Sequence, residues 1–245
     1  MRGGGSPIRL AEITAILREE YEEVWIKNFD EIVGGTDMLA RAFVANLRSK
    51  PRMGCKVVRL EQTSAGATAF FLDGPGRPVQ RVDGDVMIVT VPLGVLQKIQ
   101  VQPAFSGAKM RAIRQVTYDS STKVIMHAGR RFWEMDENIY GGGTYTDLPT
   151  GITYYPSDNA ARRDPRVSEG PGVFLASYTW GQDALQWGAM DEETRLEEAL
   201  DDVERIHPGI RKVYETGATH AWYGDRWARG AFALFAPEQQ TDLHP

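Results

Sequence analysis

The sequence is poor in residues that form disulfides or bind metals. It has one cysteine, Cys55, so no internal disulfide can form and a cysteine-rich metal site is excluded. Its four histidines lack the H-E-x-x-H spacing of zinc proteases (His127, His207, His220 and His244). No G-x-S-x-G motif is present, and a Ser-His-Asp triad, whose members can lie far apart in a sequence, has no motif in its favour. We expect no metal site.

Long apolar runs and an excess of positive charge are also missing. The most apolar stretches, around 86–91 and 173–176, are far too short to span a bilayer. A formal net charge of -5 argues against nucleic acid or an anionic membrane as the main partner. Residues 1–7 have no apolar core like that of a signal peptide, so a native start predicts a cytoplasmic protein, whereas a start further upstream leaves secretion open.

The first half of the chain contains two helical patterns and a β-rich region. One helix is expected after Ser6-Pro7, where an N-cap residue precedes proline, and a second after Thr36, with apolar residues at helical spacing. The period then switches to two, which predicts a β-meander with Asp83-Gly84 as its tightest turn. Its expected strands are 55–61, 67–73, 78–82 and 85–90.

The second half alternates strands, short helices and ordered loops. Short helices are expected at 93–98 and 107–114, and apolar strands at 122–128 and 173–178. A polar surface loop is expected at 157–165. A clear amphipathic helix begins at Asp191 and is stopped by His207-Pro-Gly209. The pattern predicts an α+β protein built around antiparallel sheet.

Lys123 is the sharpest candidate for chemistry. It lies in an otherwise apolar strand, and a buried lysine is costly unless it is paired or neutral, which makes the position a functional suspect. The alternative, which the alternation itself favours, is that the ammonium points to solvent. A set of aromatic residues is equally compatible with ordinary packing or with an apolar pocket for an amino-acid side chain. These residues are Tyr154, Tyr155, Tyr178, Trp180, Trp222 and Trp227.

Several motifs occur in an order that resembles one enzyme family. They are Phe29-Asp-Glu-Ile-Val-Gly-Gly35, Ser-Thr-Lys123-Val-Ile, Phe132-Trp-Glu, Asp147-Leu-Pro149 and Tyr154-Tyr-Pro156. From about residue 32 to 237 the chain resembles the flavin amine oxidases, particularly their L-amino-acid oxidase branch. The resemblance implies an α+β substrate-binding domain with a mixed, mainly antiparallel sheet and flanking helices, together with an incomplete piece of an FAD-binding domain.

The same resemblance divides the chain and assigns site residues. It implies a helical segment of the substrate domain at 1–34, a partial FAD-binding domain at 35–105, the substrate-binding domain at 106–221, and a return towards the FAD-binding domain at 222–245. Lys123 matches a lysine that holds a water near flavin N5 and assists hydride transfer or flavin reoxidation. Tyr178 and Trp180 are expected to line the substrate cavity. The implied cofactor contacts are Trp222 near the isoalloxazine ring, the backbone of Val57 (or of the adjacent Val58) at the adenine, and a strand end at Thr90 and Pro92.

The sequence also departs from the family pattern. It contains no G-x-G-x-x-G after a strand to hold a pyrophosphate, no acidic residue downstream of such a motif for the ribose, and no closing Gly-Glu segment. Asp119 stands four residues before Lys123, where some members of the branch have arginine. A carboxylate at that position leaves the substrate open.

These observations lead to one expected function and one alternative. The expected function is FAD-dependent oxidation of an L-amino acid or amine, in which a hydride passes to the flavin, O₂ becomes H₂O₂ and the imine hydrolyses to a 2-oxo acid. An amide product, as in a monooxygenase, stays open. We expect the chain to be inactive by itself, as a fragment or as a subunit that joins complementary chains. The alternative is a non-catalytic module that binds an amino-acid-like ligand or a protein partner.

Overall fold

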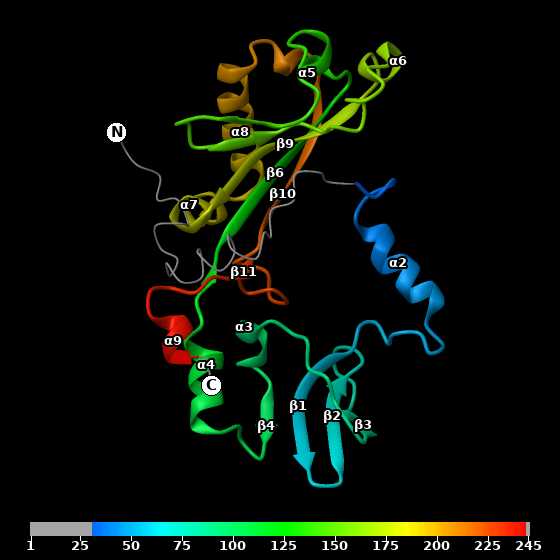
Figure 1. Ribbon diagram of the computed structural model, residues 1–245, viewed down its shortest axis with the longest axis vertical. Coiled ribbons are helices and arrows are strands. Elements are labelled where there is room, and N and C mark those ends of the chain that lie inside the picture. Colours follow the sequence, from blue (N-terminus) through cyan, green and yellow to red (C-terminus); the bar gives the residue numbers. More distant parts are fainter. Residues whose placement is uncertain (1–30, 244–245) are drawn as a thin grey trace. The chain divides into compact units, whose positions relative to one another are not determined.

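The computed structural model describes residues 31–243 (Figure 1). The helix predicted after Ser6-Pro7 lies outside the described residues. Contacts divide the described chain into two units. The larger unit is Thr117–Pro237, and the smaller unit consists of residues 31–116 and 238–243. The assignment of segments to substrate-binding and FAD-binding domains remains a prediction.

The smaller unit is built on a four-stranded sheet in the order β3-β2-β1-β4. β1 (Lys56–Thr63), β2 (Gly66–Leu72) and β3 (Gln80–Gly84) form an antiparallel meander, and β4 (Gln100–Gln102) runs parallel to β1. The first three expected strands of the meander are therefore confirmed.

The fourth expected strand, 85–90, is wrong. Gly84 belongs to β3 instead of a hairpin turn, and the residues that follow are extended without a ladder partner among the described residues. Val86 is 82% exposed and Ile88 is 85% exposed. Alternating apolar residues favour a strand, but a strand exists only where a neighbour accepts and donates its backbone hydrogen bonds. The described part of the chain offers no such neighbour here.

Short helices complete the smaller unit. α3 (Leu93–Leu96) and α4 (Gly107–Gln115) pack on the sheet through Leu60, Leu96 and Ile113, and α9 (Gln239–Leu243) contacts α4. The Ser106 hydroxyl caps α4 by accepting from the Lys109 amide. α2 (Asp37–Asn46) forms as predicted, yet it has no buried residue.

The larger unit contains a five-stranded antiparallel sheet in the order β10-β6-β9-β8-β7. Its strands are β6 (Ser121–Ala128), β7 (Gly143–Tyr145), β8 (Ile152–Tyr154), β9 (Gly172–Trp180) and β10 (Tyr214–Ala221). Two further strands, β5 (Tyr118–Asp119) and β11 (Phe232–Ala233), form a short antiparallel pair, and β5 directly precedes β6 in the chain. The predicted α+β class with mainly antiparallel sheet is confirmed.

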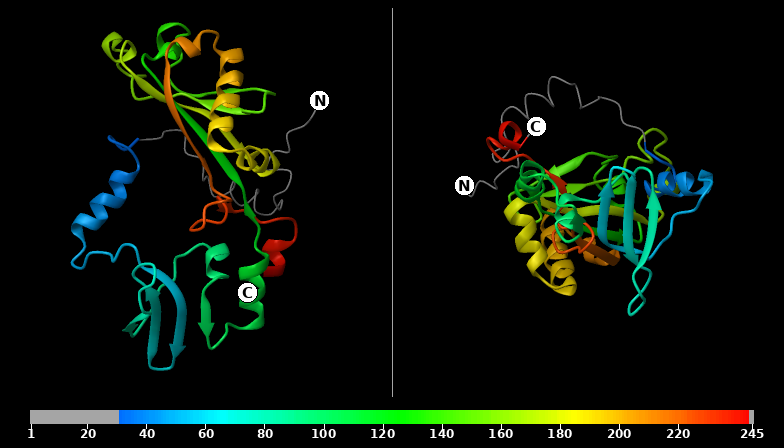
Figure 2. Two further views of the ribbon diagram at one scale, coloured as in Figure 1. Left: turned by 180° about the vertical axis from the view of Figure 1, so that it is seen from behind. Right: turned by 90° about the horizontal axis from the view of Figure 1, so that it is seen from below.

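Two helices cover one face of this sheet. α7 (Gly181–Ala189) and α8 (Glu192–Ile206) contact β6, β9 and β10, and Figure 2 shows α8 in front of these strands when the molecule is seen from behind. The Asp191 carboxylate caps α8, and the helix stops before His207 as predicted. The core between the helices and the sheet includes Val124, Met126, Phe174, Trp187, Leu200 and Val203.

The Phe132-Trp-Glu motif forms a buried anchor in α5 (Phe132–Met135). Burial by itself would raise the pKa of Glu134, but hydrogen bonds from Asn159, Ser168 and Arg131 outweigh it and leave that pKa below its ordinary value. Asn159 is 2% exposed, so the segment predicted as a polar surface loop is tied into the core at this point. The loop then leads into α6 (Pro165–Ser168).

A second buried polar chain stabilises the end of α8. His207, which is 3% exposed, pairs through Nδ1 with Glu137 Oε1 at 2.6 Å and through Nε2 with the Tyr155 hydroxyl at 2.5 Å. The Tyr155 hydroxyl also lies 2.8 Å from Thr144 Oγ1. Since Tyr155 is buried, the histidine nitrogen has no route to solvent water if this hydroxyl is removed.

Replacing Tyr155 with phenylalanine is therefore expected to lower the free energy of unfolding by about 1–3 kcal/mol, the cost of an unpaired buried polar group. Urea denaturation followed by circular dichroism measures the change. Tyr145→Phe is the matched control, because Tyr145 is 71% exposed. An equal loss in both variants would contradict the assigned role of the buried chain.

Candidate functional site

Lys123 lies on the sheet face of the larger unit that points away from α7 and α8. In β6 the residues Thr122 and Val124 point towards the helices and are buried, whereas Lys123 between them is half-buried on the second face. Lys123 is directly opposite Tyr178 on β9 and His220 on β10. Its Nζ atom lies 4.5 Å from the centre of the Tyr178 ring.

The Lys123 ammonium has no carboxylate partner within 4 Å among residues 31–243. The ammonium is neither buried with an ion-pair partner nor fully solvated. Its position therefore lies between the two alternatives considered from the sequence, a buried lysine and a lysine that points to solvent. An ammonium held over an aromatic face and left without an ion pair retains hydrogen atoms to donate. This arrangement can hold a water molecule or a polar group of a ligand.

A row of aromatic rings extends from Lys123 across the same face, and we call Tyr154, Tyr178, Trp180 and Phe232 the aromatic row. Ring centres are 6.3 Å apart for Tyr154 and Tyr178, 5.2 Å for Tyr178 and Trp180, and 5.4 Å for Trp180 and Phe232. The hydrogen bond between the Tyr145 and Tyr154 hydroxyls, with partial burial, raises the pKa of Tyr154 to about 12. Tyr154 therefore stays a neutral phenol at physiological pH.

Trp222 lies on the other side of Lys123. Its ring packs edge-on against His220, with 4.3 Å between ring centres, and His220 is the residue opposite Lys123 on β10. The structure thus brings Lys123, Tyr178, Trp180 and Trp222, which are far apart in sequence, into one unit. Trp222 and Trp180 are more than one-third exposed, so a ligand can reach both rings.

The remaining predicted site residues, Val57, Thr90 and Pro92, belong to the smaller unit. The register of β1 with β2 shifts between Val57 and Arg59, so Val58 has no partner in that ladder. The β4 ladder reaches only to Arg59. A bulge of this kind leaves backbone groups free to bond a ligand, which suits either Val57 or Val58. Thr90 is exposed, and the Pro92 carbonyl accepts hydrogen bonds from the Val95 and Leu96 amides of α3.

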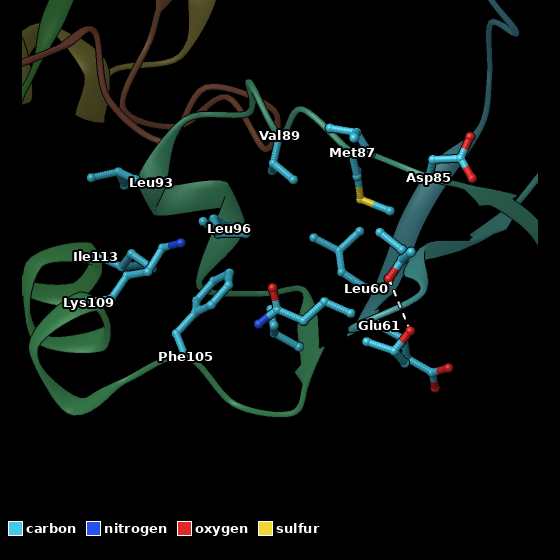
Figure 3. A pocket seen from close by; sticks show the side chains of 16 residues that line it. Leu60, Glu61, Asp85, Met87, Val89, Leu93, Leu96, Phe105, Lys109 and Ile113 are labelled. Carbon is cyan, nitrogen blue, oxygen red and sulfur yellow. Dashed lines mark hydrogen bonds between the residues drawn. The ribbon is translucent and has the colours of Figure 1, made fainter.

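Sequence reasoning missed a cavity in the smaller unit (Figure 3). The cavity has a volume of about 510 Å³, within the range of small-molecule sites, and most of the residues that line it are apolar. Glu61 and Asp85 lie at the strand side of the cavity, and Lys109 lies at the helix side over the Phe105 ring at 4.2 Å. The lining comes from segments spread between Leu60 and Ile113, so no local motif signals it.

Among residues 31–243 no group of three or more His, Cys, Asp or Glu side chains is placed to hold a metal ion. No helix within those residues has the length and apolar character needed to cross a membrane.

Comparison with known proteins identifies the family. The model of the flavin containing amine oxidoreductases matches residues 4–245, and the chain belongs to this family. It is 35% identical over 233 residues to an L-amino-acid oxidase of Siganus canaliculatus, covering 94% of this chain and 43% of that protein. It is 32% identical over 236 residues to a putative L-amino-acid oxidase of Bacillus subtilis (strain 168), covering 95% of this chain and 48% of that protein.

Solved structures agree on the fold. Putrescine oxidase bound to putrescine superposes with a TM-score of 0.65 at 18% identity, covering 85% of this chain and 43% of that one. The chain thus has the fold of part of a flavin amine oxidase. It spans less than half the length of the two oxidases described above.

The described residues offer groups that suit FAD at separate places. In the larger unit, Trp222 provides an exposed ring for stacking and Lys123 an unpaired donor. In the smaller unit, the bulge at Val58 frees backbone hydrogen-bonding groups. These residues fit the rings of FAD. The sequence contains no G-x-G-x-x-G motif for its pyrophosphate.

Proposed function

We propose that the protein oxidises an L-amino acid or a related amine with the help of FAD. The observation that carries the proposal is the unpaired Lys123 ammonium, held 4.5 Å from the ring of Tyr178, an inner member of the aromatic row. A donor of this kind suits a reaction in which a proton and a hydride leave adjacent atoms of a bound substrate. Membership in the flavin containing amine oxidoreductases supports the same chemistry.

Each residue of the site has a role in this proposal. Lys123 holds a water at the reacting centre and orients it by donating a hydrogen bond. Tyr178 and Trp180 bind the apolar part of the substrate through their ring faces and exclude bulk water from it. Trp222 stacks on the ring system of the cofactor, and Val57 or Val58 bonds the adenine through the backbone. When bound, FAD would supply the redox chemistry, as the acceptor of the hydride on the carbon that carries the amino group and as the source of the two electrons that reduce O₂ to H₂O₂.

Two substrate classes are consistent with the relatives. The curated relatives described above are named as L-amino-acid oxidases, and the solved structure is a putrescine oxidase. An L-amino acid would give an imine that hydrolyses to a 2-oxo acid and ammonia, whereas an amine would give an aldehyde. Mass spectrometry of the product separates these outcomes and also detects an amide, the product of a monooxygenase.

The test uses the purified whole enzyme, in which we propose that these 245 residues are joined by the residues or chains that complete the cofactor site. We expect a flavin absorption band that survives desalting, and peroxide formation with at least one member of a panel of L-amino acids and amines. Boiled protein and D-amino acids are the controls. A protein that retains flavin but oxidises nothing in the panel, or one that never retains flavin, would contradict the proposal and favour a non-catalytic binding module.

For the 245 residues by themselves we expect a different result. Incubation with FAD followed by desalting should leave a colourless protein, because these residues contain no G-x-G-x-x-G motif of the kind that holds the pyrophosphate. A retained band with protein-perturbed maxima would show that another part of the chain completes the cofactor site.

A further inference from the structure

Two inaccessible polar atoms without hydrogen-bond partners lie on residues that pair with Trp180 and Phe232, at one end of the aromatic row. Asp119 Oδ2 and Ser121 Oγ are both inaccessible to solvent, and neither has a hydrogen-bond partner among the described residues. Ser121 is 2% exposed as a whole. Orphaned buried polar atoms are rare in native proteins and cost free energy, so such a pair calls for a partner that residues 31–243 do not supply.

Strand pairing places these two side chains beside aromatic rings. Asp119 is directly opposite Phe232 in the β5–β11 pair, and Ser121 is directly opposite Trp180 in the β6–β9 pair. Directly opposed residues of an antiparallel pair point to the same face, with Cβ atoms about 4.5–5.5 Å apart. The Trp180 and Phe232 rings are themselves in contact, so all four side chains border one site, which we call the Asp119 site.

The chemistry of the Asp119 site selects a cation. Asp119 Oδ1 accepts a hydrogen bond from the Ser120 amide, which leaves Oδ2 as the free acceptor. No lysine, arginine or histidine among residues 31–243 forms an ion pair with this carboxylate. A carboxylate flanked by aromatic faces binds ammonium and guanidinium groups through charge-assisted hydrogen bonds and cation–π contact.

We propose that the Asp119 site binds a cationic group at the far end of the substrate and thereby selects basic substrates. This inference rests on the proposed function. Asp119 and Lys123 are four positions apart in the sequence, a span of roughly 13 Å if the backbone is extended. The reacting amine would lie near Lys123 and the second cation would lie at Asp119, so the substrate needs several methylene groups between the two. L-Lysine-like amino acids and long diamines have this chemistry.

The test compares two substrates that differ in one charge. L-Lysine carries a terminal ammonium that L-norleucine lacks. In the flavin-loaded protein, Asp119→Asn keeps the oxygen that accepts from Ser120 but removes the charge. We expect kcat/KM for L-lysine to fall about 10-fold or more and kcat/KM for L-norleucine to change less than about twofold, the size of one charge-assisted hydrogen bond.

The control is Asp183→Asn, which removes an exposed carboxylate in the first turn of α7 close in sequence to Trp180. We expect it to leave the ratio of the two kcat/KM values unchanged. Equal losses for both substrates in Asp119→Asn, or no loss for either, would overturn the proposal, because a structural role does not distinguish them. Thermal denaturation confirms that the variant folds.

A binding measurement separates this inference from the proposed function. If neither substrate is oxidised, the proposed function fails, and calorimetric titration of the same protein with L-lysine and L-norleucine still tests the cation site. Tighter binding of L-lysine that Asp119→Asn weakens about 10-fold supports the site. Equal affinity for the two amino acids overturns it.

Discussion

Replacing Lys123 with methionine is expected to slow flavin reduction by substrate, or flavin reoxidation by O₂, about 100-fold, the lower end of what a positioned proton donor or acceptor contributes. Methionine keeps most of the length and the apolar stem of lysine but cannot donate a hydrogen bond to a water. Because Tyr178 and Trp180 still hold the apolar part of the substrate, its dissociation constant should change less than about threefold. Stopped-flow absorbance measures both half-reactions separately.

The same substitution at an exposed lysine is the matched control. Lys212→Met, at the end of the 3-10 turn after α8, is expected to leave both rates unchanged. If Lys123→Met leaves flavin reduction and reoxidation at their original rates, the role assigned to Lys123 is wrong. A variant that loses substrate affinity with normal rates would instead assign Lys123 to substrate binding.

Replacing Glu134 with glutamine is expected to lower the free energy of unfolding by about 3 kcal/mol, as when one partner of a buried charge pair is removed. The Glu134 side chain is fully buried. It accepts hydrogen bonds from Asn159 at 2.7 Å and Ser168 at 2.7 Å and forms an ion pair with Arg131 at 3.0 Å. Glutamine would place an NH₂ group where a carboxylate oxygen now accepts, and that group would face side chains that are themselves hydrogen-bond donors. Urea denaturation followed by tryptophan fluorescence measures the loss.

Glu169→Gln is the control, because Glu169 is exposed and one residue beyond α6. It should change stability by less than about 0.5 kcal/mol. Comparable losses in the two variants would show that the buried network contributes nothing specific.

The Glu134 effect should also depend on pH. The pKa of Glu134 is below its ordinary value of 4.5 in the folded chain, so the unfolded chain binds more protons as the solution becomes acidic. The stabilisation is therefore fully present above the unfolded pKa and is lost as pH falls through the folded pKa. The difference in stability between the parent protein and Glu134→Gln should shrink between about pH 5 and pH 3. A constant difference over this range would contradict the assignment.

Local sequence patterns predicted many elements correctly. The apolar spacing after Asp191 predicted α8 and its stop at His207, and alternation predicted β1, β2, β6 and β9. The same signal was wrong at 85–90, where alternation is present without a partner strand. Periodicity reports which side chains can share a face, and it carries no information about which backbone is available to pair.

The candidate site shows the same division. The sequence marked Lys123, Tyr178, Trp180 and Trp222 through family motifs. It did not show that Lys123 lies over the Tyr178 ring without an ion pair, nor that the inaccessible Oδ2 atom of Asp119 belongs to the residue paired with Phe232, which is more than a hundred residues away in the chain. Likewise, Glu134 belongs to a visible motif, while its partners Asn159 and Ser168 are 25 and 34 residues further on.

By itself, the sequence determined the α+β class, most of the strands and helices and the family, and it named the candidate site residues, because these depend on residue type and short spacing. The tertiary structure decided which of those residues meet, which polar atoms are left without partners, and where the cavity lies. Such features depend on strand order and register, which are set by contacts between segments far apart in the chain. The free carboxylate of Asp119 and the unpaired ammonium of Lys123 are both products of that pairing.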